Sequence, residues 1–262
     1  MVKAESALAS RRPSALESRR LALEALANPR VPFAPVSIVL KPFLIWATSD
    51  QPHSNMLVNS HADPIGMSWG QVATEATSLP GGSNNLRLQF WYLWQNERDY
   101  YEVVNPKALM IFDGNCTITA NTGIFSGGDA SVHCQTVLNP MQWWESPTIP
   151  DPFQTDRVRD VFRVSASGGG LFSASDFDGE TLDSVVHELR YEHFVIPPKE
   201  TAVILVQVTF YCDLEDGTID IDFASTPRND FPHSIQCQLQ LDLLTAPGVN
   251  GPLTFDNTMA LG

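Results

Sequence analysis

The chain has 262 residues, of which 43% are hydrophobic and 18% are charged, and it contains 19 prolines and 16 glycines. This length and composition are typical of a folded protein with many short elements and turns, in one large β domain or two small ones, and they argue against a disordered or a mainly helical chain. The formal net charge is -14, and no apolar run reaches the ~18 residues that a membrane-spanning helix needs.

The charge is unevenly distributed along the chain. Residues 1–30 carry six basic and three acidic side chains, a net charge of +3, whereas the remaining 232 residues carry 10 basic and 27 acidic ones, a net charge of -17. In the basic segment the motif Ser-Ala-Leu-x-Ser-Arg-Arg occurs twice, at residues 6–12 and 14–20. The acidic part should repel nucleic acid and anionic membranes, whereas the basic segment can be attracted to either of them or to the acidic part of another copy.

Residues 1–30 are predicted to form a basic helical arm. Pro13 suits a first helical turn, helix-forming residues fill positions 15–27, and Asn28-Pro29 ends the pattern because the residue before a proline disfavours the α conformation. An isolated helix of about 14 residues is marginal in water, so we expect the arm to lie on another surface. Its contacts would come from the two arginine pairs and from leucines seven residues apart, namely Arg11, Arg12, Leu16, Arg19, Arg20 and Leu23.

The same segment bears on where the protein is made. An Arg-rich, Ser-containing start resembles a transit peptide, but three glutamates within the first 30 residues count against this interpretation. The segment lacks the continuous apolar stretch of a secretory signal. We therefore expect a soluble protein that is made in the cytoplasm and that can end in a particle such as a virion.

From residue 31 onward the apolar pattern has the period of two that predicts strands. Residues 36–47 are expected to form one strand, with a bulge or an edge position at Pro42. After a weak strand near 67–73, the strongest run covers 84–97, in which one face is core and consists of Leu86, Leu88, Phe90, Tyr92 and Trp94. The other face is polar at its ends and apolar in the middle, at Trp91 and Leu93, which predicts that another element covers it.

The rest of the chain continues as strands separated by turn residues. Asp113-Gly114 is expected to be a hairpin turn between 108–112 and 116–120, and Asp216-Gly217 a turn between 201–212 and 218–223. Further strands are predicted at 131–138, 161–166, 185–196 and 235–243, with Gly168-Gly169-Gly170 as a bent connection. About ten strands without alternating helices predict an all-β fold, an antiparallel β-sandwich of jelly-roll type, in a single domain over 31–262.

The cysteines and histidines do not predict a metal site. The four cysteines lack C-x-x-C spacing and fall on apolar strand faces, so we expect reduced core cysteines, with disulfides as the alternative; they are Cys116, Cys134, Cys212 and Cys237. The segment from His187 to His193 begins with His-Glu, but a metalloprotease helix would need a second histidine where Tyr191 stands. On a strand the two histidines would lie about 20 Å apart, too far to hold one ion.

Two acidic clusters remain as candidate calcium loops, at residues 176–180 and 213–216. Calcium favours several carboxylate oxygens on a turning loop, but the frame set by Gly179 would place Ala174 and Val185 at the first and last ligand positions of an EF-hand, which excludes that motif. Solvated turns are the alternative. No Gly-x-Ser-x-Gly elbow and no phosphate loop occur, and neither a catalytic residue nor a cofactor is predicted.

Two adjacent tryptophans stand outside the alternating pattern. Trp143 and Trp144 lie between Pro140 and Pro147, and neighbouring residues of an extended strand point to opposite faces. At least one of them is therefore expected to pack against a loop, a protein partner or a ligand.

These features predict a non-enzymatic structural subunit that self-assembles as coat, capsid or filament proteins do, with its basic arm docked on the acidic body of a neighbour. In the order of its elements the chain is similar to viral coat proteins that place an arm before a jelly roll. Nucleic acid is a weaker partner of the arm, because a few net charges give few phosphate contacts. The alternative is a β-sandwich that binds a glycan or another ligand at Trp143, Trp144 or the 168–180 loop, and a hydrolase on a β scaffold is a third hypothesis.

Overall fold

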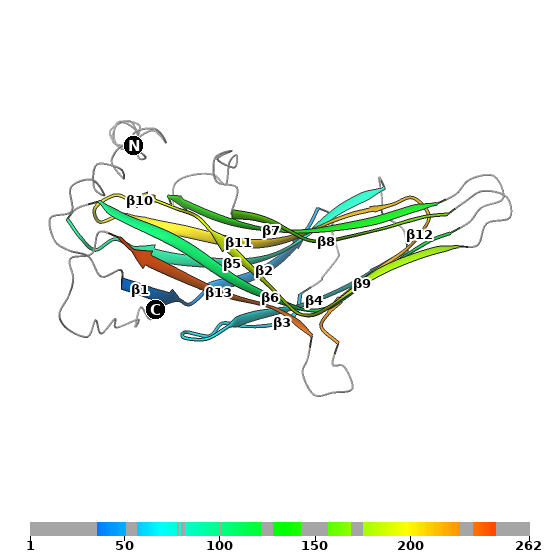
Figure 1. The fold of residues 1–262 in the computed structure, drawn as a ribbon, viewed down its shortest axis with the longest axis horizontal. Helices are drawn as coiled ribbons and strands as arrows, with labels where there is room; N and C mark the ends of the chain where they lie inside the picture. The colour runs from blue at the N-terminus through cyan, green and yellow to red at the C-terminus, as the bar shows by residue number, and fades with distance from the viewer. Residues whose placement is uncertain are drawn as a thin grey trace, which may run out of the picture.

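The computed structural model describes residues 36–50, 57–77, 79, 82–99, 101–121, 128–142, 157–168, 175–225 and 233–244. These residues form two antiparallel sheets that face each other (Figure 1). The strands in chain order are β1 (Val36–Leu40), β2 (Leu44–Ser49), β3 (Leu57–His61), β4 (Ser68–Ala76), β5 (Ser83–Gln95), β6 (Glu102–Ala120), β7 (Asp129–Gln142), β8 (Val158–Ser167), β9 (Asp176–Arg190), β10 (Phe194–Ile196), β11 (Thr201–Leu214), β12 (Gly217–Phe223) and β13 (Ser234–Leu243).

The five-stranded sheet is a single row of strands, whereas the eight-stranded sheet has additional pairings off its main row. The five-stranded sheet has the order β2-β5-β11-β7-β8. In the eight-stranded sheet the long strand β6 pairs with β9 and β10 on one side and with β12 and β13 on the other. Beyond β12 and β13 lie β4 and β1, and β3 pairs with β4. Every one of these pairings is antiparallel, so the prediction of an all-β, antiparallel sandwich is confirmed.

The core lies between the sheets and follows the alternation of the sequence. On β5, β11, β12 and β13 every second side chain is buried, because successive residues of a strand point to opposite faces. Aromatic rings bridge the two layers: the Phe210 ring from β11 lies 5.7 Å from the Phe223 ring of β12, measured between centroids. Trp94 is half-buried at the end of the core face of β5. All four cysteines are buried and free, so the prediction of core thiols is confirmed.

Two predicted strands are each divided in two. Residues 36–47 form β1 and most of β2, which belong to different sheets. The break falls at Pro42, because proline has no backbone N–H to donate to a neighbouring strand. The expected edge position is confirmed, since β1 and β2 are each the last strand of their sheet. Residues 185–196 belong to β9 and β10, separated at 191–193, where His193 adopts a φ of 57°.

The predicted hairpin turn at Asp113-Gly114 is wrong. Strand β6 runs without interruption through both residues, and a register shift against β9 marks the position instead. A Cβ atom added at Gly114 would lie 2.5 Å from the Phe223 ring and 2.6 Å from the Asp222 carbonyl oxygen. Glycine is needed here for the close approach of β12.

The turn at Asp216-Gly217 exists, but it joins strands of different sheets. Strand β11 belongs to the five-stranded sheet and β12 to the eight-stranded one, so this turn crosses the end of the sandwich. A Cβ atom at Gly217 would lie 1.9 Å from the Thr119 carbonyl oxygen. The chain can cross here because Gly217, which lies against β6, has no side chain. The predicted helical arm lies outside the described residues.

Candidate interaction surface

The outer face of the five-stranded sheet carries the residues that the sequence singles out. Strand β5 directs Trp91 and Leu93 to this face, since the alternate residues Phe90 and Tyr92 are buried in the core. Leu93 is 47% exposed and Trp91 is half-buried. None of the described residues covers Leu93, so the expected covering element is not found in this part of the chain.

The neighbouring edge strand β2 extends this apolar surface. Leu44 lies opposite Trp91 and Trp46 lies opposite Gln89, so both side chains point outward. Phe43 precedes the strand. The exposed fractions are 55% for Phe43, 39% for Leu44 and 52% for Trp46. We call the residues Phe43, Leu44, Trp46 and Leu93 the β2 patch.

The centre of this face is polar and internally hydrogen-bonded. The indole Nε1 of Trp91 donates to Oε1 of Gln89 at 3.2 Å, and Nε2 of Gln89 donates to Oε1 of Gln207 at 2.8 Å. Nε2 of Gln207 in turn donates to the Thr209 hydroxyl at 2.8 Å. These hydrogen bonds link side chains of the neighbouring strands β5 and β11 and fix their positions on the outer face.

Charged groups flank the polar centre on both sides. Near β2, Arg87 and Asn85 donate to the Asp50 carboxylate, and the hydrogen bond from Arg87 is the main reason why the pKa of Asp50 is lowered. Near β8, hydrogen bonds from Gln135 and His133 lower the pKa of Asp160. Both carboxylates therefore stay ionised and paired at neutral pH.

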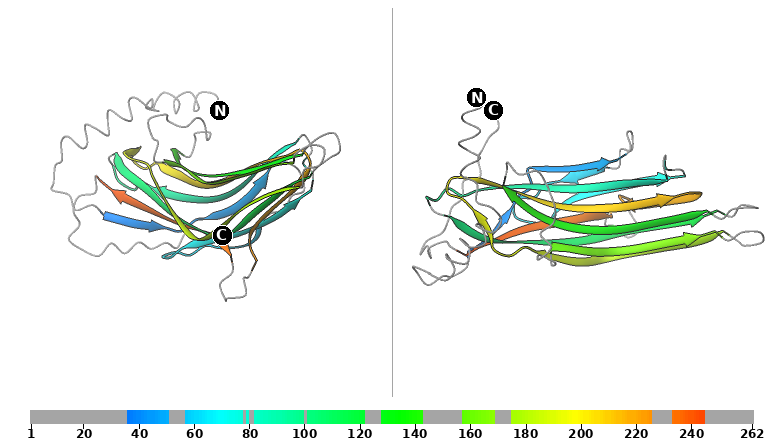
Figure 2. Two further views of the ribbon diagram at one scale, coloured as in Figure 1. Left: turned by 45° about the vertical axis from the view of Figure 1, so that its right-hand side comes forward. Right: turned by 90° about the horizontal axis from the view of Figure 1, so that it is seen from above.

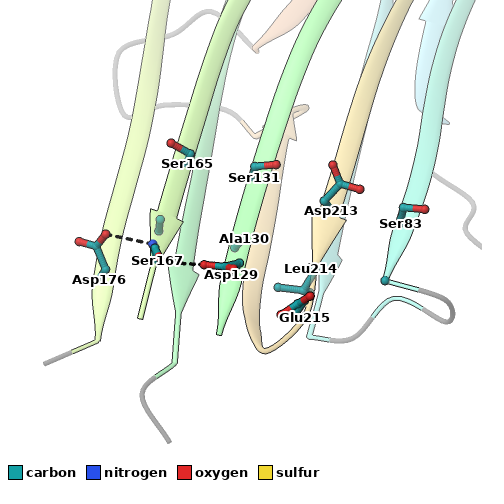
Figure 3. A pocket seen from close by; sticks show the side chains of 12 residues that line it. Ser83, Asp129, Ala130, Ser131, Ser165, Ser167, Asp176, Asp213, Leu214 and Glu215 are labelled. Atoms are coloured by element: carbon teal, nitrogen blue, oxygen red, sulfur yellow. Dashed lines mark hydrogen bonds between the residues drawn. The ribbon is translucent and has the colours of Figure 1, made fainter. Parts of the chain in front are cut away.

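An open pocket of about 620 Å³ lies at the far end of the same face (Figure 3). Strand pairing brings its polar side chains into one row, because Asp213 lies opposite both Ser83 and Ser131, and Ser131 lies opposite Ser165. Carboxylates from β7, from β9 and from the turn after β11 join this row. The polar lining residues are Ser83, Asp129, Ser131, Ser165, Ser167, Asp176, Asp213 and Glu215.

The structure brings residues of both candidate calcium clusters to this pocket, and the carboxylates of the first cluster, Asp176 and Asp178, accept hydrogen bonds from the protein backbone. The backbone amide of Ser165 donates to Asp178 at 2.9 Å and that of Ser167 donates to Asp176 at 3.1 Å. The Ser167 hydroxyl donates to Asp129 at 2.6 Å. Among the described residues, no group of three or more His, Cys, Asp or Glu is arranged to hold a metal ion. In this part of the chain the acidic residues of β9 serve the edge of β8.

His187 and His193, which begin and end the segment compared with a metalloprotease motif, lie in different surroundings. His187 is on β9, with its ring edge-on to Phe112 at 5.7 Å, and burial lowers its pKa, with a smaller effect from Arg159. His193 lies between β9 and β10, where its backbone amide donates to Asn105. Within the described ranges, neither histidine belongs to a group of three or more residues arranged to hold a metal ion.

A serine and a histidine that the sequence did not single out lie side by side at the start of β13. The Ser225 hydroxyl is 3.1 Å from Nδ1 of His233, and Nε2 of His233 is 4.0 Å from an Asp113 oxygen. The second distance exceeds a hydrogen bond, so among the described residues Asp113 does not orient this histidine as the acid of a catalytic triad would. The backbone amide of His233 also donates to the Ser225 carbonyl.

Several predicted site residues lie outside the described residues, namely Arg11, Arg12, Leu16, Arg19, Arg20, Leu23, Trp143 and Trp144. Trp91 and Leu93 lie on the face that the alternation of β5 predicts, whereas the side chains of β2 on this face are not among the predicted site residues. A signal was present, because the alternation restarts after Pro42 with Leu44 and Trp46 in one phase. The pocket could not be found in this way, since its residues come from strands far apart in the sequence.

Comparison with known proteins adds no relative, as neither a family model nor a curated protein matches the chain. Within the described residues, no helix has the length and apolar character that crossing a membrane requires.

Proposed function

We propose that the protein is a non-enzymatic structural subunit that self-assembles, as coat, capsid or filament proteins do, through its basic arm. The proposal is carried by the charge difference within the chain, with +3 on residues 1–30 and -17 on the remaining residues. In the proposed assembly the arm is a helix that docks on the body of a neighbouring subunit, and the sandwich has jelly-roll topology. Docking offsets the repulsion between acidic bodies and stabilises a helix too short to persist alone.

The acidic pocket on the five-stranded sheet supports this proposal, because it could bind basic side chains of the arm. The pocket on the five-stranded sheet contains carboxylates, and guanidinium groups bind carboxylates with two parallel hydrogen bonds. Among the described residues, no side chain donates a hydrogen bond to Asp213 or Glu215, and both carboxylates line the pocket. They fit an arginine pair of the arm, whereas a nucleic acid would meet like charge on this face. In a particle such as a virion, this contact would repeat between neighbours.

The test compares two full-length variants with equal changes in charge. Arg19→Ser with Arg20→Ser removes two charges from the arm, and Arg98→Ser with Arg190→Ser removes two from the exposed surface of the body. Sedimentation velocity at low salt should show smaller assemblies for the arm variant and unchanged ones for the body variant. Identical assemblies for both variants would contradict the role of the arm.

A second candidate function is the binding of a glycan or another small polar ligand. The observation in its favour is the same pocket, in which serine hydroxyls and carboxylates face an open volume of about 620 Å³, and the exposed ring of Tyr211 stacks on His133 nearby. Titration calorimetry with a panel of oligosaccharides tests it. Binding that is lost in Tyr211→Ala would favour this function, and an absence of heat with every sugar would exclude it.

A further inference from the structure

Among the described strands, β2 is an edge of the five-stranded sheet with one neighbour. It is the last strand in the order of that sheet and pairs with β5 on one side (Figure 2, right). The Asp50 amide donates to the Asn85 carbonyl, so in antiparallel alternation Trp46 and Thr48 direct their backbone groups toward β5. The N–H and C=O groups of Ile45 and Ala47 then point away from the sheet, and none of the described residues pairs with them.

The opposite edge of the same sheet is protected. Strand β8 contains Arg159, Asp160 and Arg163, and Asp176 and Asp178 of β9 accept hydrogen bonds from its backbone amides. Charged side chains and covered amides are the usual means by which proteins prevent edge strands from pairing with other chains. Strand β2, with the sequence Leu-Ile-Trp-Ala-Thr-Ser, has no charge and no proline.

The other described edges near β2 are weaker candidates for pairing. Strand β3 has a register shift against β4, and bulges of this kind twist an edge away from partners. Strand β1 is also uncharged, but it has five residues, and Val39 is its one exposed large apolar side chain. Strand β2 combines an open backbone with the β2 patch, whose four apolar side chains are each more than one-third exposed.

We propose that β2 pairs antiparallel with β2 of a second copy, so that two five-stranded sheets become one continuous sheet with a two-fold axis. This inference rests on the proposed self-assembly and names one of its contacts. The backbone groups of Ile45 and Ala47 gain partners, and the two β2 patches meet on the outer face. A two-fold contact of this kind is self-complementary and closed.

Charge selects a second copy and sets its direction. A chain of net charge -14 repels itself over most of its surface, and β2 is a strand without any acidic residue. Lys41 precedes the strand and Asp50 follows it. Antiparallel pairing places Lys41 of each copy at the same end as Asp50 of the other, whereas parallel pairing would bring like charges together.

The experiment uses the full chain and two matched variants. Trp46→Lys places a charge in the β2 patch, and Val58→Lys makes the same kind of change on the edge strand β3, where Val58 is 60% exposed. Because a buried tryptophan is a frequent hot spot of interfaces, Trp46→Lys should raise the dissociation constant of the dimer about 30-fold or more, measured by sedimentation equilibrium. Val58→Lys should leave it within about two-fold of the wild type.

A second measurement does not depend on any variant. Hydrogen exchange of the peptide over residues 43–50, followed by mass spectrometry, should slow in the wild type as the protein concentration rises. Equal exchange at all concentrations, or equal dissociation constants for wild type and Trp46→Lys, would overturn the pairing of β2. If assemblies persist in Trp46→Lys and are lost when the arm arginines are replaced, the β2 contact is wrong while the proposed function stands. A dimer that is lost in Trp46→Lys but never grows with an intact arm would support β2 pairing and contradict the arm.

Discussion

The contact between β8 and β9 offers a quantitative test of how the sandwich is closed at one side. Asp178 and Asp176 accept hydrogen bonds from the Ser165 and Ser167 amides at 2.9 and 3.1 Å. A hydrogen bond to a charged acceptor contributes about 1.5–3 kcal/mol, and we take the lower end because this edge is exposed to solvent. The double variant Asp176→Ala with Asp178→Ala should therefore lower the free energy of unfolding by about 2–3 kcal/mol.

Urea unfolding followed by circular dichroism measures this loss, and a thermal scan should show a fall in Tm of about 4–12 °C for a chain of this size. Amide exchange at Ser165 and Ser167 should become faster in the same variant. The matched control is Glu180→Ala. It removes an exposed carboxylate of the same strand that accepts no hydrogen bond from the described residues. A loss below about 0.5 kcal/mol in the double variant, equal to that of the control, would refute the role of these carboxylates.

Three further predictions concern the core and the surface charges. Gly114→Ala should destabilise the fold by about 1–3 kcal/mol, since its Cβ atom would meet the Phe223 ring; a neutral result in urea unfolding would contradict the close contact. Burial raises the pKa of all four cysteine thiols, to about 12 for Cys212 and for Cys237, so a thiol reagent at pH 8 should label none of them in the native protein and all of them after unfolding. Burial alone would raise the pKa of Asp242, but hydrogen bonds from Lys107 and neighbouring polar groups outweigh it and lower the pKa below 3.8. This carboxylate therefore stabilises the fold above pH 3.8, and its contribution falls as the pH drops through the folded pKa. The free energy of unfolding of Asp242→Asn should be lower than that of the wild type by about 1 kcal/mol at neutral pH, and this difference should disappear in acid.

Periodicity predicted the class of fold because every second side chain of a half-buried strand is apolar. The last strand illustrates this, since the predicted core residues Cys237 and Leu239 are fully buried. Periodicity could not show which sheet a strand joins. The sequence predicts an irregularity of one strand at Pro42, whereas the chain crosses there from one sheet to the other.

Glycine was the other source of error. Asp-Gly is typical of hairpin turns, but Gly114 lies inside a strand because a ring from a distant segment packs on it. Such contacts join residues about a hundred positions apart and leave no local signal. The candidate surface was predicted in part for the same reason. The outward position of Leu93 follows from the alternation within its own strand, whereas the place of Trp46 beside it and the pocket depend on how the strands pair.

Assembly driven by the charge of the arm can be tested by measuring the mass of the protein in solution. Light scattering should be measured at about 10 mM and about 1 M salt, between which the Debye length falls from ~30 Å to ~3 Å. We expect assemblies larger than a dimer at low salt that dissociate to dimers at high salt, because backbone hydrogen bonds and apolar side chains make up most of the β2 contact and salt does not screen them. The mass of a single chain at both salt concentrations would contradict this expectation.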